Sequence, residues 1–161
     1  MLAKNYIYEG LRWIALVVAI VMLAVMFGGN TVSDASFEEV SAAVLETVDT
    51  QNMTLAENQM VKRLYGLDPA TFEGCVLYYP TTNMMAEELL IIQLKDVSQQ
   101  EAVRTAVEAR IQTQKNTFEG YGVEQFEMLS NNAVVELRGN YVLFVVNSKS
   151  AEALRAFLGA L

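Results

Sequence analysis

The sequence predicts an α+β fold: one N-terminal transmembrane helix, then a small domain. Three observations predict it, namely an apolar run near the N-terminus, four segments with strand character, and several helical segments bounded by capping residues. The expected order of elements in the domain is α-α-β-β-α-β-β-α. Strand pairs of this kind predict a four-stranded antiparallel sheet with helices packed mainly on one face.

The apolar run extends from Trp13 to Phe27, and the next charged residue is Asp34. A helix that crosses a hydrocarbon core of about 30 Å needs roughly 20 such residues. We therefore expect residues 13–30 to form a transmembrane anchor, with Trp13–Gly29 in contact with membrane lipid. A cleaved secretory signal peptide is the alternative, because small residues suited to cleavage follow the run.

The basic residues predict the orientation of this segment. Lys4 and Arg12 precede the run, and no further Lys or Arg occurs before Lys62. Positive charge remains on the cytoplasmic side, so residues 1–12 are predicted to be cytoplasmic. A short linker at 31–35 then leads to an extracytoplasmic domain at 36–161, which would be secreted if the segment were cleaved.

Two helices are expected at the start of the domain. Each begins with a capping box, in which a hydroxyl residue precedes a glutamate by three positions: Ser36 with Glu39, and Thr54 with Glu57. The boxes predict helices over about 36–49 and 54–65. Gly66 suits the left-handed position that ends the second helix.

Two strands and a long helix are expected next. Residues 75–79 have strand character up to Pro80, and residues 87–95 form the second strand. The second strand is apolar on one face throughout and on the other face in part, so part of the second sheet face is expected to be shielded. A third capping box, Ser98 with Glu101, predicts a helix that continues to about Phe118.

A hairpin and a helix complete the chain. The predicted strands at 133–138 and 141–147 are separated by Gly139-Asn140, a pair that suits a tight primed turn. Tyr141–Val146 is apolar on both faces, which predicts a central position in the sheet. The final helix, over about 150–161, is expected to bury Leu154, Phe157, Leu158 and Leu161.

An ordered series of short segments carries a family resemblance: Leu64-Tyr65-Gly66-Leu67, Ala86-Glu87-Glu88-Leu89, Leu94-Lys95-Asp96, Asn132-Ala133-Val134-Val135 and Gly139-Asn140-Tyr141-Val142. Over roughly residues 37–161 the chain resembles an envelope-protein family of clostridia-like Firmicutes, the domain of unknown function 4358. The resemblance implies an extracytoplasmic domain behind a signal, lipoprotein or membrane anchor, with no established activity. It also implies an association with membrane O-acyltransferases and their accessory proteins, which modify envelope polymers.

The composition argues against several classes of function. The chain has no histidine and one cysteine, Cys75, so it lacks the commonest general base and cannot build a thiolate metal site. No phosphate-binding loop, dinucleotide fingerprint or nucleophile elbow occurs. We therefore predict no catalytic residue, cofactor or metal. The net charge of −8 argues against a nucleic-acid partner.

The single cysteine has two possible roles. Cys75 lies in a predicted strand, where a small apolar residue is the simplest interpretation. A cysteine without an intramolecular partner leaves an intermolecular disulfide as the alternative.

A polar cluster is the first candidate site. Glu88 shares a strand face with core residues, and Arg110 and Gln114 lie near the apolar stripe of the long helix. We hypothesise that Glu88 meets Arg110 or Gln114 at the edge of the core. A structural ion pair is favoured over a binding site, because buried charges usually serve structure.

The second candidate site is the loop between the first two predicted strands. It presents Pro80, Met84 and Met85 after Tyr79, and methionine and aromatic residues make adaptable contact surfaces. Burial of the methionines under the sheet is favoured over contact with a partner.

These observations predict a non-catalytic accessory or binding subunit of a cell-envelope assembly, with a membrane or envelope protein as its partner. The resemblance adds a possible link to O-acylation of envelope polymers. A ligand-sensing extracytoplasmic domain is the alternative, and an enzyme that acts on envelope glycans is a third possibility.

Overall fold

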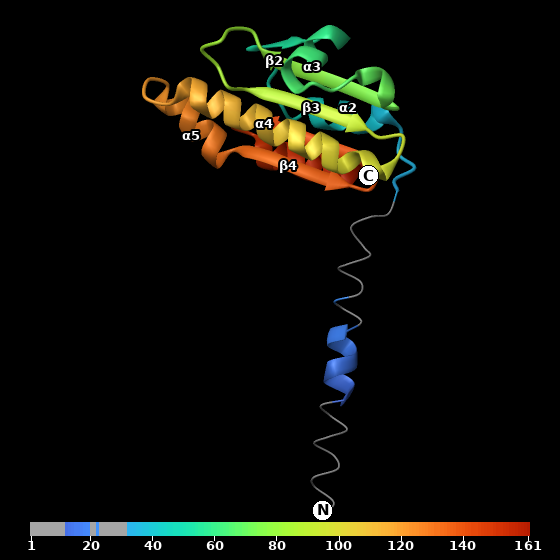
Figure 1. Cartoon of the computed structure of the whole chain (residues 1–161). Helices are drawn as coiled ribbons and strands as arrows, with labels where there is room; N and C mark the ends of the chain where they lie inside the picture. The colour runs from blue at the N-terminus through green and yellow to red at the C-terminus, as the bar shows by residue number, and fades with distance from the viewer. Residues whose placement is uncertain (1–11, 20–21, 23–31) are drawn as a thin grey trace, which may run out of the picture. The chain divides into compact units, whose positions relative to one another are not determined.

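The computed structural model describes residues 12–19, 22 and 32–161 (Figure 1). The chain divides into two units, Met1–Thr31 and Val32–Leu161, which are treated separately below.

In the first unit, residues 12–19 are helical. Most of the predicted anchor, at 20–21 and 23–30, lies outside the described residues, as does the predicted cytoplasmic segment up to residue 11. Among the helices in the described ranges, none combines the length and the apolar character that a membrane crossing requires.

The second unit is built on a five-stranded sheet with the strand order β1-β2-β3-β5-β4, in which every neighbouring pair is antiparallel. The strands are β1 (Met53–Leu55), β2 (Gly74–Pro80), β3 (Glu88–Gln93), β4 (Ala133–Arg138) and β5 (Tyr141–Val146). The prediction of an antiparallel sheet is confirmed, and the predicted number of four strands is wrong.

The additional strand is β1, which pairs with β2 at one edge of the sheet. Thr54 lies in the middle of β1, so the capping box predicted from Thr54 and Glu57 does not form. A strand of three residues is too short to show a two-residue periodicity, and its backbone pairing with β2 is a long-range interaction.

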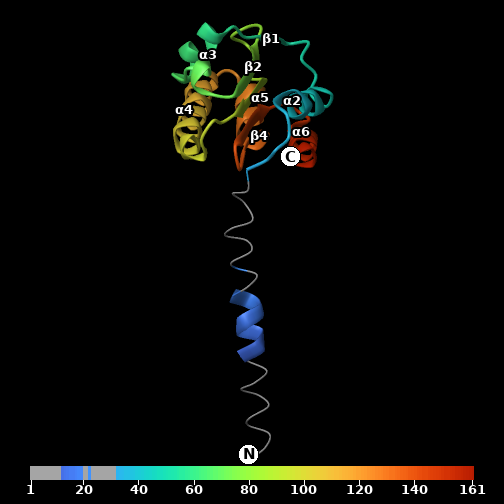
Figure 2. The ribbon, with the colours of Figure 1, turned by 90° about the vertical axis from the view of Figure 1, so that its right-hand side faces the viewer.

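Helices cover both faces of the sheet. They are α2 (Phe37–Leu45), α3 (Asn58–Tyr65), α4 (Gln100–Phe118), α5 (Val123–Asn131) and α6 (Ser150–Ala160), with short 3₁₀ turns at Pro69–Thr71 and Val97–Gln99. Figure 2 shows α3 and α4 on one side of the sheet and α2 and α6 on the other. The prediction that helices lie mainly on one face is therefore wrong.

The reason for this arrangement is the apolar character of β3 and β5 on both faces. Leu90 and Phe144 belong to the core formed with α3, α4 and α5. Leu89 and Leu143 belong to a second core, formed with α2 and α6. All four side chains are fully buried. Because both strands would expose large apolar areas on an open face, each face of the sheet is covered by helices.

Some of the capping residues predicted from the sequence are found at the ends of the helices, and others are not. The capping box of Ser36 and Glu39 forms at the start of α2, and Gly66 ends α3 with a φ of 69°. The box predicted from Ser98 and Glu101 is wrong, because Asp96 and Gln99 form the box just before α4. The carboxylate of Asp96 accepts the backbone N–H of Ser98 at 2.8 Å.

The last hairpin has the predicted strands, and β5 lies between β3 and β4 inside the sheet. In its turn Gly139 has a φ of 54° and Asn140 does not have a positive φ. This pattern of φ is that of a type II′ turn, one of the two primed types. In α6 Phe157 is buried as predicted, but Leu158 is 41% exposed, which corrects the prediction for that residue.

The segment before α2 is bonded to the rest of the domain. The hydroxyl of Ser33 donates to the carbonyl oxygen of Leu161 at 2.9 Å, and its backbone N–H donates to Asn140 Oδ1 at 2.8 Å. The hydroxyl of Tyr141 donates to the carbonyl oxygen of Ala35 at 2.8 Å. Ser33 and Ala35 belong to the predicted linker. The hydrogen bond from Ser33 to Leu161 connects the start of the domain to its C-terminus.

Candidate functional site

A buried carboxylate lies where β3 begins. Glu88 is the first residue of β3 and its side chain is fully buried on the face that α3 and α4 cover. Arg110 and Gln114 are four positions apart on α4, so both lie on the same side of that helix. Tyr65 is the last residue of α3 and reaches the same carboxylate. Three elements distant in sequence thus build one polar cluster.

The carboxylate of Glu88 has several hydrogen-bond donors around it. Arg110 donates through Nε to both oxygens at 3.2 Å and through Nη2 to Oε2 at 2.9 Å. Gln114 Nε2 donates to Oε2 at 2.7 Å, and the hydroxyl of Tyr65 donates to Oε1 at 2.5 Å. These donors satisfy the negative charge of Glu88, which would otherwise be costly to bury.

Burial and the adjacent carboxylate also determine the state of the phenol. Burial, with the negative charge of Glu88 as the next cause, raises the pKa of Tyr65 well above its usual value. Tyr65 therefore remains a neutral donor to Glu88 throughout the physiological range of pH. Its ring also packs edge-on against Phe144, with ring centroids 6.5 Å apart.

The preceding glutamate points to the other face of the sheet edge, as alternation along the chain predicts. Glu87 accepts hydrogen bonds from Asn147 Nδ2 at 3.0 Å and from Asn52 Nδ2 at 3.2 Å. Glu87 and Glu88 therefore do not converge on one proton.

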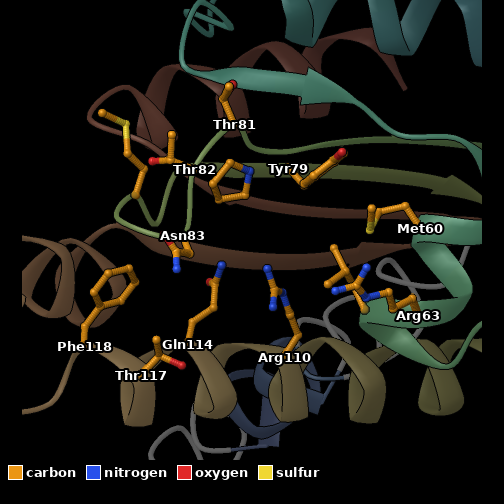
Figure 3. A pocket seen from close by; sticks show the side chains of 13 residues that line it. Met60, Arg63, Tyr79, Thr81, Thr82, Asn83, Arg110, Gln114, Thr117 and Phe118 are labelled. Carbon is orange, nitrogen blue, oxygen red and sulfur yellow. The ribbon is translucent and has the colours of Figure 1, made fainter.

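A cavity of about 370 Å³ lies beside the cluster. It is lined by Met60, Arg63, Leu64, Tyr79, Pro80, Thr81, Thr82, Asn83, Met85, Arg110, Gln114, Thr117 and Phe118. Figure 3 shows Arg110 and Gln114 rising from α4 toward the end of β2 and its loop. The structure thus places both sequence-derived candidate sites around one cavity.

Some predicted residues lie outside the cavity lining. Glu88 is covered by Arg110 and Gln114, so it supports the wall of the cavity without lining it. Met84 is 62% exposed and is not among the lining residues, whereas Met85 is partly buried and lines the cavity. The favoured prediction, burial under the sheet, is therefore wrong for Met84.

Two important members of this region are absent from the predicted sites. Tyr65 is the end of a predicted helix, and nothing local in the sequence indicates that its hydroxyl meets Glu88. Arg63 is a basic residue in the last turn of α3, and it lines the cavity beside Arg110 (Figure 3). One signal was available: Met60 and Leu64 form the apolar side of the same helix, which places Arg63 beside that side.

The carboxylate of Glu88 is enclosed by its hydrogen-bond donors. Both oxygens of Glu88 accept bonds from the cluster, and its side chain has no exposed area. A general base needs to be within reach of the proton that it removes. In the part of the chain that the structure describes, no group of three or more Cys, Asp or Glu side chains is placed to hold a metal ion.

Comparison with known proteins identifies the family. The family described as Domain of unknown function (DUF4358) matches residues 46–147. This range includes the whole polar cluster and all residues that line the cavity. No curated protein and no solved structure gives a significant match. The chain therefore belongs to the DUF4358 family.

Proposed function

We propose that this protein is a non-catalytic binding module that serves as an accessory subunit of a cell-envelope assembly. The observation that carries the proposal is the cavity beside Arg110 and Gln114. Its wall is held in place by bonds to a fully buried carboxylate, so the two side chains are preorganised for recognition.

The N-terminal sequence supports the proposed position of the domain in the cell envelope. The apolar run Trp13–Phe27 follows Lys4 and Arg12, the pattern of an anchor with a cytoplasmic N-terminus. The domain then lies outside the membrane, where an O-acylation assembly for envelope polymers is one possible partner. If the run is removed as a signal peptide, the domain is instead secreted.

Site-specific cross-linking in native membranes tests this role. A photoreactive residue at Met84, which is 62% exposed beside the cavity, is expected to capture one defined envelope protein. The matched control places the same residue at Leu158, which is 41% exposed on α6, across the sheet. Capture of only the protein itself, or the same capture from both positions, would contradict the accessory role.

A ligand-sensing domain is the second candidate, and a specific atom favours it. Gln114 Oε1 is buried and has no hydrogen-bond partner among the described residues. A ligand that supplies the missing donor would stabilise the folded domain and raise its melting temperature. An increase that depends on Gln114 is the expected result for a sensor.

A further inference from the structure

An acceptor that lacks a donor belongs to a residue of the cavity wall. Gln114 is 5% exposed, and its Oε1 has no partner within the described part of the chain. An unsatisfied buried polar atom costs about 1–3 kcal/mol, so the site favours a ligand or water that donates to it. Gln114 lines the cavity, but its Oε1 is itself buried, so an occupant contacts this oxygen only after a small shift of the side chains that cover it.

The orientation of this amide is fixed by its other contact. Gln114 Nε2 donates to Glu88 Oε2 at 2.7 Å. An ionised carboxylate only accepts hydrogen bonds, so the reversed amide would place two acceptors against each other. Gln114 therefore keeps Oε1, an acceptor, as the amide atom that does not bind Glu88.

Two guanidinium groups line the same cavity as Gln114. Arg110 uses Nε and Nη2 for Glu88, which leaves Nη1 for another acceptor. Arg63 is exposed, and it is the one arginine among residues 32–161 that forms no salt bridge. Figure 3 shows both arginines at the same cavity.

The charge of the lining is opposite to that of the protein. Of the described residues that line the cavity, none is acidic, while the chain as a whole has a net charge of −8. Arginine binds carboxylates well because its planar guanidinium matches their geometry.

The remaining walls suit an apolar group. Apolar and aromatic side chains from α3, α4, the end of β2 and the loop after it form these walls, namely Met60, Leu64, Tyr79, Met85 and Phe118. A cavity of about 370 Å³ is within the usual range for small ligands.

From these features we propose that the cavity binds a carboxylate that has an N–H group on the adjacent carbon and an apolar side chain. This is the chemistry of an N-acylated amino acid or of a peptide C-terminus. The carboxylate lies between Arg63 and Arg110, and the N–H donates to Gln114 Oε1. The inference rests on the proposed binding function and specifies its ligand class.

Titration of the full chain in detergent with N-acetyl-leucine tests the ligand class. We expect binding by calorimetry and a rise in melting temperature. N-acetyl-leucinamide lacks the carboxylate and 4-methylpentanoate lacks the N–H, so each is expected to bind at least about tenfold more weakly. Equal binding of either analogue, or no binding of N-acetyl-leucine, overturns the proposal.

Substitutions of Arg63 and Gln114 test which side chain contacts which group of the ligand. Arg63→Gln is expected to weaken binding of N-acetyl-leucine at least about tenfold, because the charged partner of the carboxylate is lost. Arg155→Gln, on the α6 face, removes the same charge and should have no effect. Gln114→Met should remove the preference for N-acetyl-leucine over 4-methylpentanoate. Unchanged affinity in Arg63→Gln overturns the proposal even if Gln114→Met fails to fold.

A short peptide that ends in leucine distinguishes the two sources of this chemistry. A second cavity of about 370 Å³ shares Met60, Arg63 and Tyr79 with the first, so a longer chain has room to continue. Tighter binding of the peptide than of N-acetyl-leucine supports a peptide C-terminus, and equal binding supports the free derivative. If neither binds while Met84 still captures an envelope protein, the ligand class is wrong and the binding role stands.

Discussion

At the scale of single residues, Glu88 organises the part of the domain that we consider functional. Its position in the strand pattern placed it on the core side of the sheet, and α4 brings Arg110 and Gln114 to it. A buried ion pair adds little net stability, but loss of one partner is costly because the other charge remains buried. The role of the cluster is therefore to hold Arg110 and Gln114 in position in the cavity wall.

The hydroxyl of Tyr65 is expected to contribute measurably to stability. Tyr65→Phe removes only the atom that donates to the carboxylate at 2.5 Å. Hydrogen bonds to charged groups contribute about 1.5–3 kcal/mol, so we expect the free energy of unfolding to fall by about 2 kcal/mol in urea denaturation. Tyr121→Phe, at a side chain that is 62% exposed, is the matched control and should change little. Equal effects of the two substitutions would show that the hydroxyl of Tyr65 is not needed.

Cys75 is expected to react slowly with thiol reagents in the folded domain. Burial raises the pKa of its thiol from 9.0 to about 11. The thiolate fraction at pH 8 is then about 100-fold lower than that of an ordinary thiol, and the thiolate is the reactive form. We expect labelling of the native protein to be slower than that of the denatured protein by a factor of this order, and to accelerate as pH rises toward 11. Similar rates in both states would contradict the burial of this thiol.

At the scale of elements, the local signals predicted most of the helices and strands. The strands from 133 to 146 and the helix that ends at Phe118 match the structure because periodicity, caps and turns act over a few residues. β1 and α5 were missed. The first is too short to show a period. The second follows a segment that contains Gly120 and Gly122, and glycines interrupt the helical pattern.

Two glycines outside the strands should respond in opposite ways to the same substitution. Gly66 ends α3 with a φ of 69°, and a Cβ there would meet no neighbour within 4 Å, so only backbone strain opposes alanine. We expect Gly66→Ala to destabilise the domain by about 1 kcal/mol. Gly159 lies in α6 with equally open surroundings, and Gly159→Ala should stabilise by about 0.5 kcal/mol.

Thermal and urea denaturation of both alanine variants provide the measurement. The two substitutions add the same methyl group, so a difference in sign isolates the effect of backbone conformation. Destabilisation by both, or by neither, would contradict the left-handed end of α3.

At the scale of the whole molecule, the domain depends on contacts between distant parts of the chain. α2 and α6, near the two ends of the domain, share one core, and Ser33 is bonded to Leu161. The core on the other sheet face joins α3, α4 and α5. The candidate cavity belongs to this second side, where the end of β2 meets α3 and α4.

The proposed orientation predicts which side of the membrane each part can be labelled from. Met84→Cys introduces a thiol at a position that is 62% exposed, and a membrane-impermeant maleimide should label it in intact cells. Asn5→Cys should be labelled only after lysis, because the N-terminus is expected to be cytoplasmic. The parent protein measures the background from Cys75. Labelling of Met84→Cys only after lysis would reverse the proposed topology.

The sequence by itself determined the fold class, most of the helices and strands, the acidic character of the domain and the side of β3 on which Glu88 lies. These properties follow from composition and from interactions between residues a few positions apart. Only the tertiary structure decided that helices cover both faces and that β1 extends the sheet. It also decided that Tyr65 joins the cluster around Glu88 and that Arg63 meets residues of α4 at one cavity. The physical reason is that these features depend on apolar faces and polar groups that are distant in sequence, and that find their partners only when the chain packs.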